Sequence, residues 1–379
     1  MNKKQDKKLF YQRRNFWKEA SPSTIKKAFA FAEPYMDFLN KAKTVRESIA
    51  YTEALLKEHK FQSIGGKKGS RRLYQIFRGK TIAMAVLGSE PLSGGFNIVA
   101  SHIDAPRVDL KQNPFYEDSS SGMACMRTHY YGGIKKYQWV STPLALHGIV
   151  IRADGSKIDV SIGEKDDEPV FIIPDLLPHL ARKEQYSKNL ADAIDASRMN
   201  LVFSGMMEPA SEEKEAIKAY TLQLLKKQLK IEESDFISAE LELVPATKAR
   251  HSGFDSSMVV GYGQDDRVCA YTALRGLLDN LDSTPKRTMI VYFSDKEEVG
   301  SQGNTGAHSV FIQDFVAALL RANGESDSSA NLRKTFINSH ILSGDVTAAV
   351  DPNYPGVHER QNAVLFNHGV GLCKFTGSG

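Results

Sequence analysis

Several apolar runs of this 379-residue chain end in residues that can bind a metal ion or move a proton. Each stands where a stretch rich in β-branched and aromatic residues gives way to a turn. They are His102 and Asp104 in "ASHIDAP", Asp265 and Asp266 in "GYGQDDRVC", Glu297 and Glu298 in "SDKEEVGS", and Asp345 in "LSGDVTAAV". Because ligands bind at the carboxyl edge of an open parallel sheet, we expect these strand ends to meet there.

One imidazole and several carboxylates suit a divalent metal ion of borderline hardness, and a carboxylate shared by two ions lets the two sit close together. Such a pair lowers the pKa of a bridging water and polarises a carbonyl group. We expect two divalent ions per subunit, zinc first, with cobalt or manganese as alternatives. Asp104 lies two residues after His102, on the same side of an extended chain, so it is predicted to hold the other ring nitrogen of that histidine.

Glu297 and Glu298 are adjacent in the sequence. Neighbouring residues on an extended chain face opposite ways, so the two glutamates are expected to have different tasks. We predict that Glu298 binds a metal ion and that Glu297 acts as the general base, which takes a proton from water and passes it to the leaving amine. Burial beside metal ions and other carboxylates brings the pKa of such a base toward 7.

Each of these motifs has a simpler interpretation when it occurs alone. A His-x-Asp at a strand end is more often a hydrogen-bonded structural histidine, and an Asp pair before a helix is commonly an N-terminal cap. A Glu pair in a loop is usually solvated, and Ser-Gly-Asp is an ordinary turn or cap. Their joint occurrence at the ends of separate apolar runs favours a metal site.

The composition is that of an ordinary soluble globular protein, with 41% hydrophobic and 25% charged residues. The 49 basic and 45 acidic residues are too balanced to indicate a nucleic-acid or membrane surface, and no stretch approaches the length of a membrane span. Cys125, Cys269 and Cys373 lack the paired spacing of disulfides or zinc ligands. The basic N-terminal run is predicted to form a solvated amphipathic helix rather than a secretion signal. We therefore expect a cytoplasmic location.

The element pattern predicts an α/β fold with an insertion. Helical spacing covers residues 23–60, a buried strand covers 96–104, and after residue 248 an acidic pair, a helix and a further strand follow. Residues 108–247 instead carry short alternating segments and one charged helical stretch, which indicates a β-rich module. We therefore predict a mostly parallel sheet with helices on both faces, in two parts, 1–107 and 248–379, interrupted by the module 108–247.

At these motifs the chain resembles the aspartyl aminopeptidase and aminopeptidase I family of dinuclear zinc exopeptidases. "SHIDAPR", "SDKEEVGS" and "SGDVTAAVDPNYPGVHE" are similar to three motifs of that family, and "HYYGGIKKYQW" is similar to the glycine-and-aromatic block of its bacterial branch. The resemblance spans nearly the whole chain. It implies a zinc-exopeptidase-like catalytic domain interrupted by a dimerisation domain, dimers that assemble into a dodecamer, and release of N-terminal residues from peptides.

Carried over by position, the resemblance implies a role for each motif residue. The implied metal ligands are His102 for one ion, Asp265 as the bridging ligand, Glu298 for the other ion, and Asp345 as a further ligand. Glu297 is the implied general base and Asp104 orients the histidine. Asp266 is expected to cap the following helix. Lys374, in "LCKF", corresponds to a basic substrate contact of the family, although a solvated lysine is the simpler interpretation.

The sequence departs from the family pattern at several points. The family carries a further histidine ligand in a Ser-Met-His-Ser segment, whereas this chain ends in "KFTGSG", so we expect the natural protein to continue. Asp351 stands where acid-preferring members are expected to have histidine. A carboxylate there would repel acidic substrates, so neutral or broader specificity is predicted. His129 is expected to be structural, although in this family a histidine from a neighbouring subunit can complete the pocket.

The predicted function is therefore that of a metal-dependent aminopeptidase acting on peptide substrates as a homo-oligomer, without a nucleic-acid or membrane partner. Two alternatives stay open. The first is a related dinuclear deacylase of N-acyl amino acids, whose substrates have no free α-amine. The second is a catalytically inactive assembly subunit, which the missing histidine ligand makes worth testing.

Overall fold

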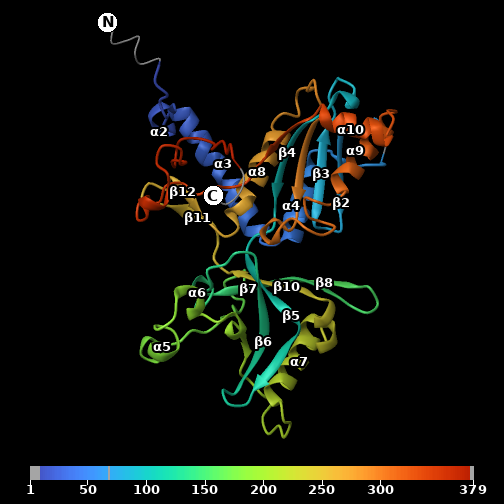
Figure 1. Ribbon diagram of the computed structural model, residues 1–379. Helices are drawn as coiled ribbons and strands as arrows, with labels where there is room; N and C mark the ends of the chain where they lie inside the picture. Colours follow the sequence, from blue (N-terminus) through green and yellow to red (C-terminus); the bar gives the residue numbers. More distant parts are fainter. Residues whose placement is uncertain (1–8, 67–68, 376–379) are drawn as a thin grey trace.

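The computed structural model describes residues 9–66 and 69–375. Two bodies make up this part of the chain, one around a mixed sheet and one around an antiparallel sheet, joined by a narrow connection (Figure 1). The N-terminal run lies partly outside the described residues. The described part of that run forms only the short helix α2 (Phe16–Glu19), so the predicted amphipathic helix does not include residues 9–15.

The sheet of the first body has the strand order β1-β2-β3-β13-β4-β14. Strands β13, β4 and β14 run parallel to one another, whereas β3 is antiparallel to both of its neighbours. The strands are β1 (Gln62–Ser63), β2 (Arg72–Phe77), β3 (Thr81–Val86), β4 (Asn97–His102), β13 (Met289–Ser294) and β14 (His340–Ser343). The sheet is therefore mixed, with its parallel part where the metal-binding motifs were predicted.

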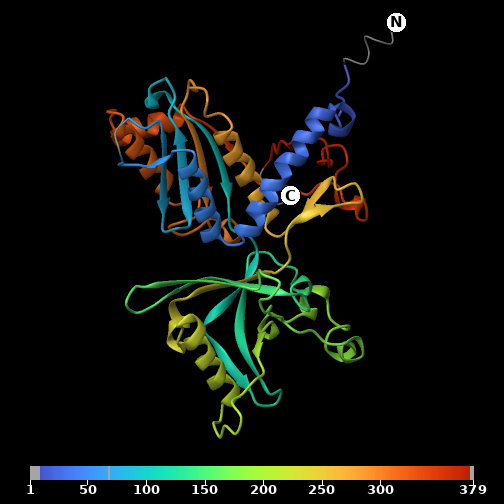
Figure 2. The ribbon, with the colours of Figure 1, turned by 180° about the vertical axis from the view of Figure 1, so that it is seen from behind.

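Helices cover both faces of this sheet, as the sequence predicted (Figure 2). Successive residues of a strand point to opposite faces. Ile82 and Met84 of β3 therefore join one core cluster with α4 and α8, while Ala83 and Ala85 join another with α9 and α10. The helices of this body are α3 (Pro22–Lys41), α4 (Val45–Glu58), α8 (Gln264–Leu278), α9 (Phe311–Ala322) and α10 (Ser329–Ile337).

The break between α3 and α4 follows from local capping. Thr44 accepts a hydrogen bond from the backbone N–H of Glu47, and the Glu47 carboxylate accepts one from the backbone N–H of Thr44. This reciprocal arrangement satisfies two of the N–H groups that a helix start leaves free. The predicted helical region 23–60 is thus two helices, and the second one carries Glu47 toward the other body.

The register of the parallel strands brings the predicted motifs to one edge. His102, the last residue of β4, pairs with Ser294, the last residue of β13. Strand β14 ends beside them, with Ser343 opposite Ala100 of β4. The segments that follow these strands therefore leave the sheet together at its carboxyl edge, which is where an open α/β sheet binds its ligands.

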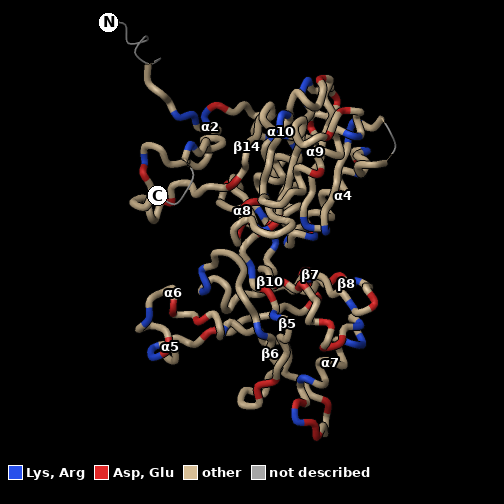
Figure 3. Tube along the Cα trace, turned by 45° about the vertical axis from the view of Figure 1, so that its right-hand side comes forward, with Lys and Arg blue, Asp and Glu red and all other residues tan. Residues whose placement is uncertain are grey.

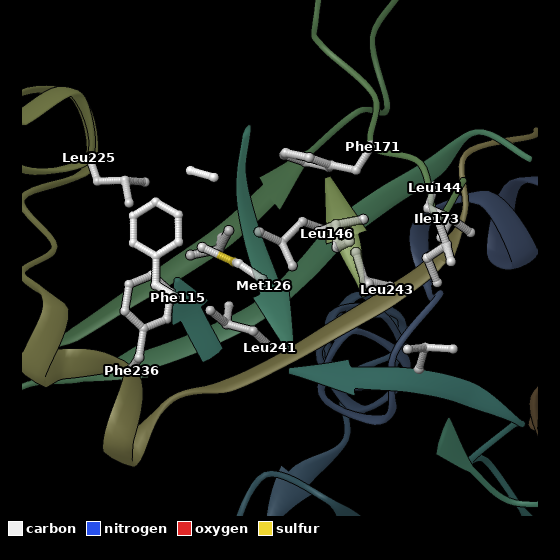
Figure 4. Packing of buried hydrophobic residues seen from close by; sticks show 14 of the residues in the cluster. Phe115, Met126, Leu144, Leu146, Phe171, Ile173, Leu225, Phe236, Leu241 and Leu243 are labelled. Carbon is white, nitrogen blue, oxygen red and sulfur yellow. The ribbon is translucent and has the colours of Figure 1, made fainter. Parts of the chain in front are cut away.

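The second body is built on an antiparallel sheet with the order β8-β7-β10-β5-β6-β9. Phe115, Met126, Phe236 and Leu241 pack between this sheet and its covering segments (Figure 4). The strands are β5 (Arg107–Asp118), β6 (Met123–Tyr131), β7 (Leu144–Ile151), β8 (Lys157–Ile162), β9 (Leu201–Ser204) and β10 (Glu240–Pro245). The helices are α5 (Pro178–Glu184), α6 (Leu190–Ala193) and α7 (Ala216–Leu229).

The chain crosses between the bodies next to the predicted site. Strand β5 starts five residues after His102, and after β10 the chain returns through the hairpin of β11 (Arg250–Ser252) and β12 (Met258–Val260) to α8. Basic and acidic residues are interspersed along the chain in both bodies (Figure 3). No helix in the part of the chain that the structure describes is long and apolar enough to cross a membrane.

Candidate metal centre and active site

Three of the predicted metal ligands meet at the carboxyl edge of the first sheet. His102, Asp265 at the start of α8, and Asp345 just after β14 each offer a ligand atom within 4.8 Å of the others. The Nε2 atom of His102 lies 3.2 Å from Oδ1 of Asp265 and 3.9 Å from Oδ1 of Asp345. The imidazole is buried, whereas the side chains of Asp265 and Asp345 are 53% and 56% exposed. The group therefore opens to solvent on its carboxylate side.

Asp104 fixes the orientation of the histidine ring. The Nδ1 atom of His102 lies 3.1 Å from both the carboxylate Oδ1 and the backbone oxygen of Asp104. Because these oxygens only accept hydrogen bonds, the bond puts a proton on Nδ1 and leaves the lone pair of the neutral ring on Nε2. Nε2 has no hydrogen-bond partner in residues 9–66 and 69–375. A buried, unpaired and correctly aimed nitrogen is what a metal ligand requires.

Glu297 and Glu298 lie on a 3₁₀ turn (Glu297–Val299), not on the extended chain that the sequence analysis assumed. Their backbone N–H groups donate hydrogen bonds of 3.0 and 3.1 Å to the two carboxylate oxygens of Asp104. The carboxylate of Glu297 comes within 3.9 Å of Nε2 of His102. Glu298 lies outside the group of three ligands, and its Oε1 is buried without a hydrogen-bond partner among the described residues.

The electrostatics of this cluster show an excess of negative charge. Burial disfavours the protonated imidazole, but the carboxylates of Asp104 and Asp265 outweigh this effect and raise the pKa of His102 to about 11. Burial together with the charge of Asp265 raises the pKa of Glu298 to about 7. Burial also raises the pKa values of Glu297 and Asp345 above their usual range. A cation would relieve all of these shifts at once.

The residues present fit a divalent metal ion. The donors are one imidazole nitrogen and several carboxylate oxygens, which is the donor set that zinc, cobalt and manganese accept. Within the described part of the chain, no lysine or arginine forms an ion pair with Asp265, Glu297, Glu298 or Asp345. The unpaired Nε2 of His102 and Oε1 of Glu298 are therefore consistent with metal coordination rather than with a closed network of salt bridges.

Asp266 does not cap α8, contrary to the prediction. Gly263 occupies the N-cap position, and the torsion angles of Asp265 and Asp266 are not helical. This backbone directs the Asp266 side chain inward. It is fully buried, and neither carboxylate oxygen has a hydrogen-bond partner in the described part of the chain. Burial raises the pKa of Asp266 to about 7. When it is ionised, this carboxylate adds negative charge close to Asp265 and Asp345.

The other residues singled out in the sequence lie apart from the cluster. Lys374 is exposed, with its Nζ 5.7 Å from the ring centre of Phe375, and within residues 9–66 and 69–375 no hydrogen bond or ion pair joins it to the cluster. Asp351 accepts a hydrogen bond from the backbone N–H of Asn353, two residues on. His129 is exposed on β6, and its ring stacks on Tyr130.

Sequence reasoning missed a tyrosine that reaches the site from the second body. Tyr131, the last residue of β6, donates a 2.8 Å hydrogen bond from its hydroxyl to Oδ2 of Asp104. Arg107, in the "SHIDAPR" motif, lies over the Tyr131 ring at 3.7 Å from its centre. The only signal in the sequence is the block "HYYGGIKKYQW", which contains Tyr131. Its contact with Asp104 depends on strand pairing between β5 and β6, which the sequence does not reveal.

A hollow of about 400 Å³ lies beside Asp265. Its lining combines apolar side chains with a few polar ones and comes from both bodies of the protein. The lining residues are Pro106, Gly133, Ile134, Lys135, Gln138, Trp139, Tyr262, Gly263 and Asp265. The hollow and the metal-ligand group thus share the carboxylate of Asp265.

Comparison with known proteins gives a consistent result. The family model described as "Aminopeptidase I zinc metalloprotease (M18)" matches residues 38–378. The probable M18 family aminopeptidase 1 of Clostridium acetobutylicum is 42% identical over 378 residues, which cover 98% of this chain and 80% of that protein. The Thermotoga maritima relative of the same description is 41% identical over 370 residues, covering 97% of this chain and 79% of its own length.

Solved structures agree with this match. The crystal structure of the M18 family aminopeptidase from Thermotoga maritima superposes with a TM-score of 0.89 at 40% identity, covering 95% of this chain and 78% of that chain. Aminopeptidase I from Clostridium acetobutylicum gives a TM-score of 0.85, also at 40% identity and with the same coverage. The predicted α/β fold, the family resemblance and the prediction of a metal-dependent aminopeptidase are confirmed. The chain therefore belongs to the M18 family of aminopeptidases, which are zinc metallopeptidases.

Proposed function

We propose that this protein removes N-terminal residues from peptides at a two-metal centre on the carboxyl edge of its first sheet. The observation that carries the proposal is the buried, unpaired Nε2 of His102, which faces the carboxylates of Asp265 and Asp345. No lysine or arginine in the described residues neutralises this group. Such a group requires a cation to balance its charge, and the M18 match indicates zinc.

His102, Asp265, Glu298 and Asp345 would hold the two ions, with Asp265 shared between them. When bound, the ions lower the pKa of a water molecule and polarise the peptide carbonyl. Asp104 keeps the histidine ring in place through its Nδ1 atom and fixes the turn that carries the two glutamates. The buried Oε1 of Glu298 has no other hydrogen-bond partner among the described residues, which supports a ligand role.

Glu297 is the proposed general base. Its side chain is 46% exposed and lies next to the ligand group, so it is accessible to both water and substrate. Its raised pKa suits a group that must accept and then release a proton. As water oxygen bonds to the carbonyl carbon, one water proton passes to Glu297. That proton then goes to the amine nitrogen as the C–N bond breaks, which leaves a free amino acid and a shortened peptide.

The hollow beside Asp265 is the proposed place for the N-terminal residue of the substrate. Its lining includes the apolar Ile134 and Trp139 together with Gln138 and Lys135. The carboxylate of Asp265 borders the hollow, and its negative charge would attract the free α-amine of the substrate. This mixed lining supports neutral or broad specificity rather than a strict preference for acidic residues, as the sequence predicted from Asp351.

We also propose that the module 108–247 is a dimerisation domain and that dimers assemble further. The proposal rests on family likeness: one neighbour in the fold comparison is a dodecamer of yeast mApe1, with a TM-score of 0.69 at 22% identity. Leu176, Leu177 and Leu180 in the second body are exposed in the single chain and supply apolar surface for such contacts. The molecular mass in solution would test this.

Activity and metal content should be measured on the same purified protein. We expect two divalent ions per subunit, hydrolysis of amino-acid anilides that carry a free α-amine, and loss of activity on chelation with recovery when zinc, cobalt or manganese is returned. The matched control is Glu297→Gln, which keeps the shape of the side chain and the metal ions but removes the base. Anilides of neutral and acidic residues should be compared in the same assay.

Two results would favour the alternatives. Hydrolysis of N-acyl amino acids, with no reaction of anilides bearing a free amine, would indicate a deacylase. Fewer than two ions per subunit, with no hydrolysis under any of the three metals, would indicate an inactive assembly subunit and contradict the proposal.

A further inference from the structure

Asp104 is the point where the parts of the candidate site are joined. It is fully buried, and its two carboxylate oxygens are close to four donors. Oδ1 accepts from Nδ1 of His102 at 3.1 Å and from the N–H of Glu297 at 3.0 Å. Oδ2 accepts from the N–H of Glu298 at 3.1 Å and from the hydroxyl of Tyr131 at 2.8 Å. A carboxylate offers about four acceptor sites, so this one is fully used.

One of these four donors comes from the second body. His102 ends strand β4 of the first sheet, and Glu297 and Glu298 lie on the turn after β13, whereas Tyr131 ends strand β6 of the other sheet. The distance along the chain from Asp104 to Tyr131 is 27 residues. The module that interrupts the catalytic sheet therefore supplies a hydrogen bond to the residue that orients the proposed metal ligand.

The tyrosine is held in place from behind. Arg107 is its pairing partner across β5 and β6, and the guanidinium carbon lies 3.7 Å from the centre of the Tyr131 ring. Arg107 is in turn fixed by carboxylates, with Nε 2.8 Å from Asp109 and 3.2 Å from Glu242. A cation over the face of an aromatic ring is an attractive contact. The hydroxyl is thus pre-positioned rather than free to rotate away.

The next residue touches the other side of the same site. Gly132 has a φ of +72°, and a Cβ atom added there would lie only 3.0 Å from Cβ of Glu298. Gly133, by contrast, has open space where its Cβ would lie. The end of β6 therefore packs against the proposed ligand Glu298 while it bonds to Asp104. Two consecutive residues of the second body support two different parts of the centre.

We propose that Tyr131 is a positioning residue of the peptidase site. Its hydroxyl holds Oδ2 of Asp104, and through Asp104 it sets both the ring of His102 and the turn of Glu297 and Glu298. This inference rests on the proposed function, since it assumes that those residues bind metal and move the proton. It also gives the inserted module a task inside the catalytic centre of its own chain, in addition to any contact between subunits.

The test is the variant Tyr131→Phe, which removes one hydroxyl and keeps the ring over Arg107. Loss of a residue that orients a metal ligand typically lowers metal affinity or activity by roughly 10–100-fold. We expect weaker binding of zinc and cobalt by about that factor, a changed visible absorption spectrum of the bound cobalt, and a lower kcat with little change in KM. KM should change little because Tyr131 does not line the hollow proposed for the substrate.

Tyr130→Phe is the matched control. Tyr130 is the preceding residue on the same strand, it is 42% exposed, and its hydroxyl makes no hydrogen bond within residues 9–66 and 69–375. This variant should match the wild type in metal affinity, cobalt spectrum and kcat. Thermal unfolding of both variants would establish that each is folded.

The outcomes separate this inference from the function on which it rests. If the wild-type protein binds no metal and cleaves no anilide, the proposed function fails, and the inference fails with it. If the wild type binds metal and hydrolyses anilides but Tyr131→Phe has the same metal affinity and kcat, the proposed function stands and the role of Tyr131 is wrong. An equal loss in Tyr130→Phe would also overturn it.

Discussion

Two buried histidines of this protein have similar surroundings on one ring nitrogen and different ones on the other. His102 and His147 are 4% and 2% exposed, and each has a carboxylate on Nδ1, Asp104 at 3.1 Å and Glu47 at 2.7 Å. Nε2 of His147 makes a 2.9 Å hydrogen bond with the carboxylate of Glu164, whereas Nε2 of His102 lies 3.2 Å from Oδ1 of Asp265 without forming a hydrogen bond in the described part of the chain. Burial and a carboxylate partner therefore do not identify a metal ligand.

The charged groups around each histidine distinguish the two clusters. Glu164 also accepts a 2.6 Å hydrogen bond from the buried Nζ of Lys43, so two cationic groups face the two glutamates around His147. Around His102 there are only carboxylates within the described residues. These are Asp104, Asp265, Glu297 and Asp345. The protein's own cationic groups balance the first cluster, whereas a metal ion would balance the second, as proposed.

The two clusters also differ in what they join. Glu47 and Lys43 belong to the segment that begins α4 in the first body, and His147 and Glu164 belong to the second body. The cluster around His147 therefore ties the two bodies together. We expect changes there to lower stability and changes around His102 to alter metal binding and activity.

Neutralising one carboxylate near each histidine should give the largest contrast. Glu297→Gln removes the proposed base, and general acid–base groups contribute roughly 10²–10⁴-fold to a rate, so kcat on amino-acid anilides should fall by about that factor. The metal content should not change. Glu47→Gln should lower the melting temperature and leave kcat per folded molecule close to that of the wild type. Equal kcat values in the two variants would contradict the assigned roles.

Replacing each histidine should separate metal binding from stability. His102→Ala should weaken zinc affinity more than the roughly 10–100-fold that follows loss of a residue that only orients a ligand. His147→Ala should keep that affinity but lose about 1–3 kcal/mol of unfolding free energy, because it leaves two half-buried carboxylates short of a partner. Isothermal titration and urea unfolding measure the two quantities. The comparison fails if His147→Ala loses metal or if His102→Ala loses most of the stability.

The stability of the protein should fall in alkaline solution because of His147. Burial lowers the pKa of this group, but Glu164 and Glu47 outweigh burial and raise it from 6.5 to about 9. Since the folded-state pKa lies above the unfolded one, the contribution is complete below pH 6.5 and is lost as the pH rises through about 9. A tenfold change in proton affinity corresponds to roughly 1.4 kcal/mol, so the loss of unfolding free energy is at most about 3.5 kcal/mol.

The measurement for this prediction is urea unfolding of the wild type and of His147→Gln at several pH values between 6 and 10. The difference in unfolding free energy between the two proteins should shrink as the pH rises. Lys43 also pairs with Glu164 and keeps part of the cluster in place. A constant difference across the range would show that His147 is not protonated in the folded protein.

The smallest expected effect concerns the glycines after Tyr131. Gly132→Ala places a Cβ atom 3.0 Å from Cβ of Glu298 at a φ of +72°, a backbone region that costs a residue other than glycine roughly 1–3 kcal/mol. We expect a moderate loss of stability and a several-fold lower kcat as Glu298 is displaced. Gly133→Ala meets nothing within 4 Å, so it should keep the stability of the wild type. Identical results for the two variants would argue against contact with Glu298.

The sequence predicted the parts of the site that depend on single strands. The apolar run before Glu297 forms β13, and "FNIVASHID" contains β4, so polar residues at the ends of these strands could be assigned to one sheet edge. Hydrophobic pattern and strand ends carry this information within a few residues of the motif. The helices on both faces followed from the same reasoning.

The parts that the sequence could not reveal depend on contacts between distant segments. Asp104 accepts the N–H groups of Glu297 and Glu298, 193 and 194 residues away, and this turns an expected extended segment into a 3₁₀ turn. Asp266 was expected to cap a helix, but the backbone of its segment sends the side chain inward. Tyr131 reaches Asp104 only because β6 pairs with β5. No local pattern encodes these relations.

The short crossing from β4 to β5 has a consequence for protein engineering. Only the segment 103–106 separates His102 from the first residue of the second sheet, and Tyr131 returns from that sheet to Asp104. A chimera that replaces the module 108–247 with the equivalent piece of another relative exchanges a hydrogen-bond donor of the active centre along with the outer surface. Recombination at these boundaries should preserve activity only when the donated module brings a tyrosine and a glycine to the same two positions. The inserted module therefore cannot be exchanged independently of the proposed active site.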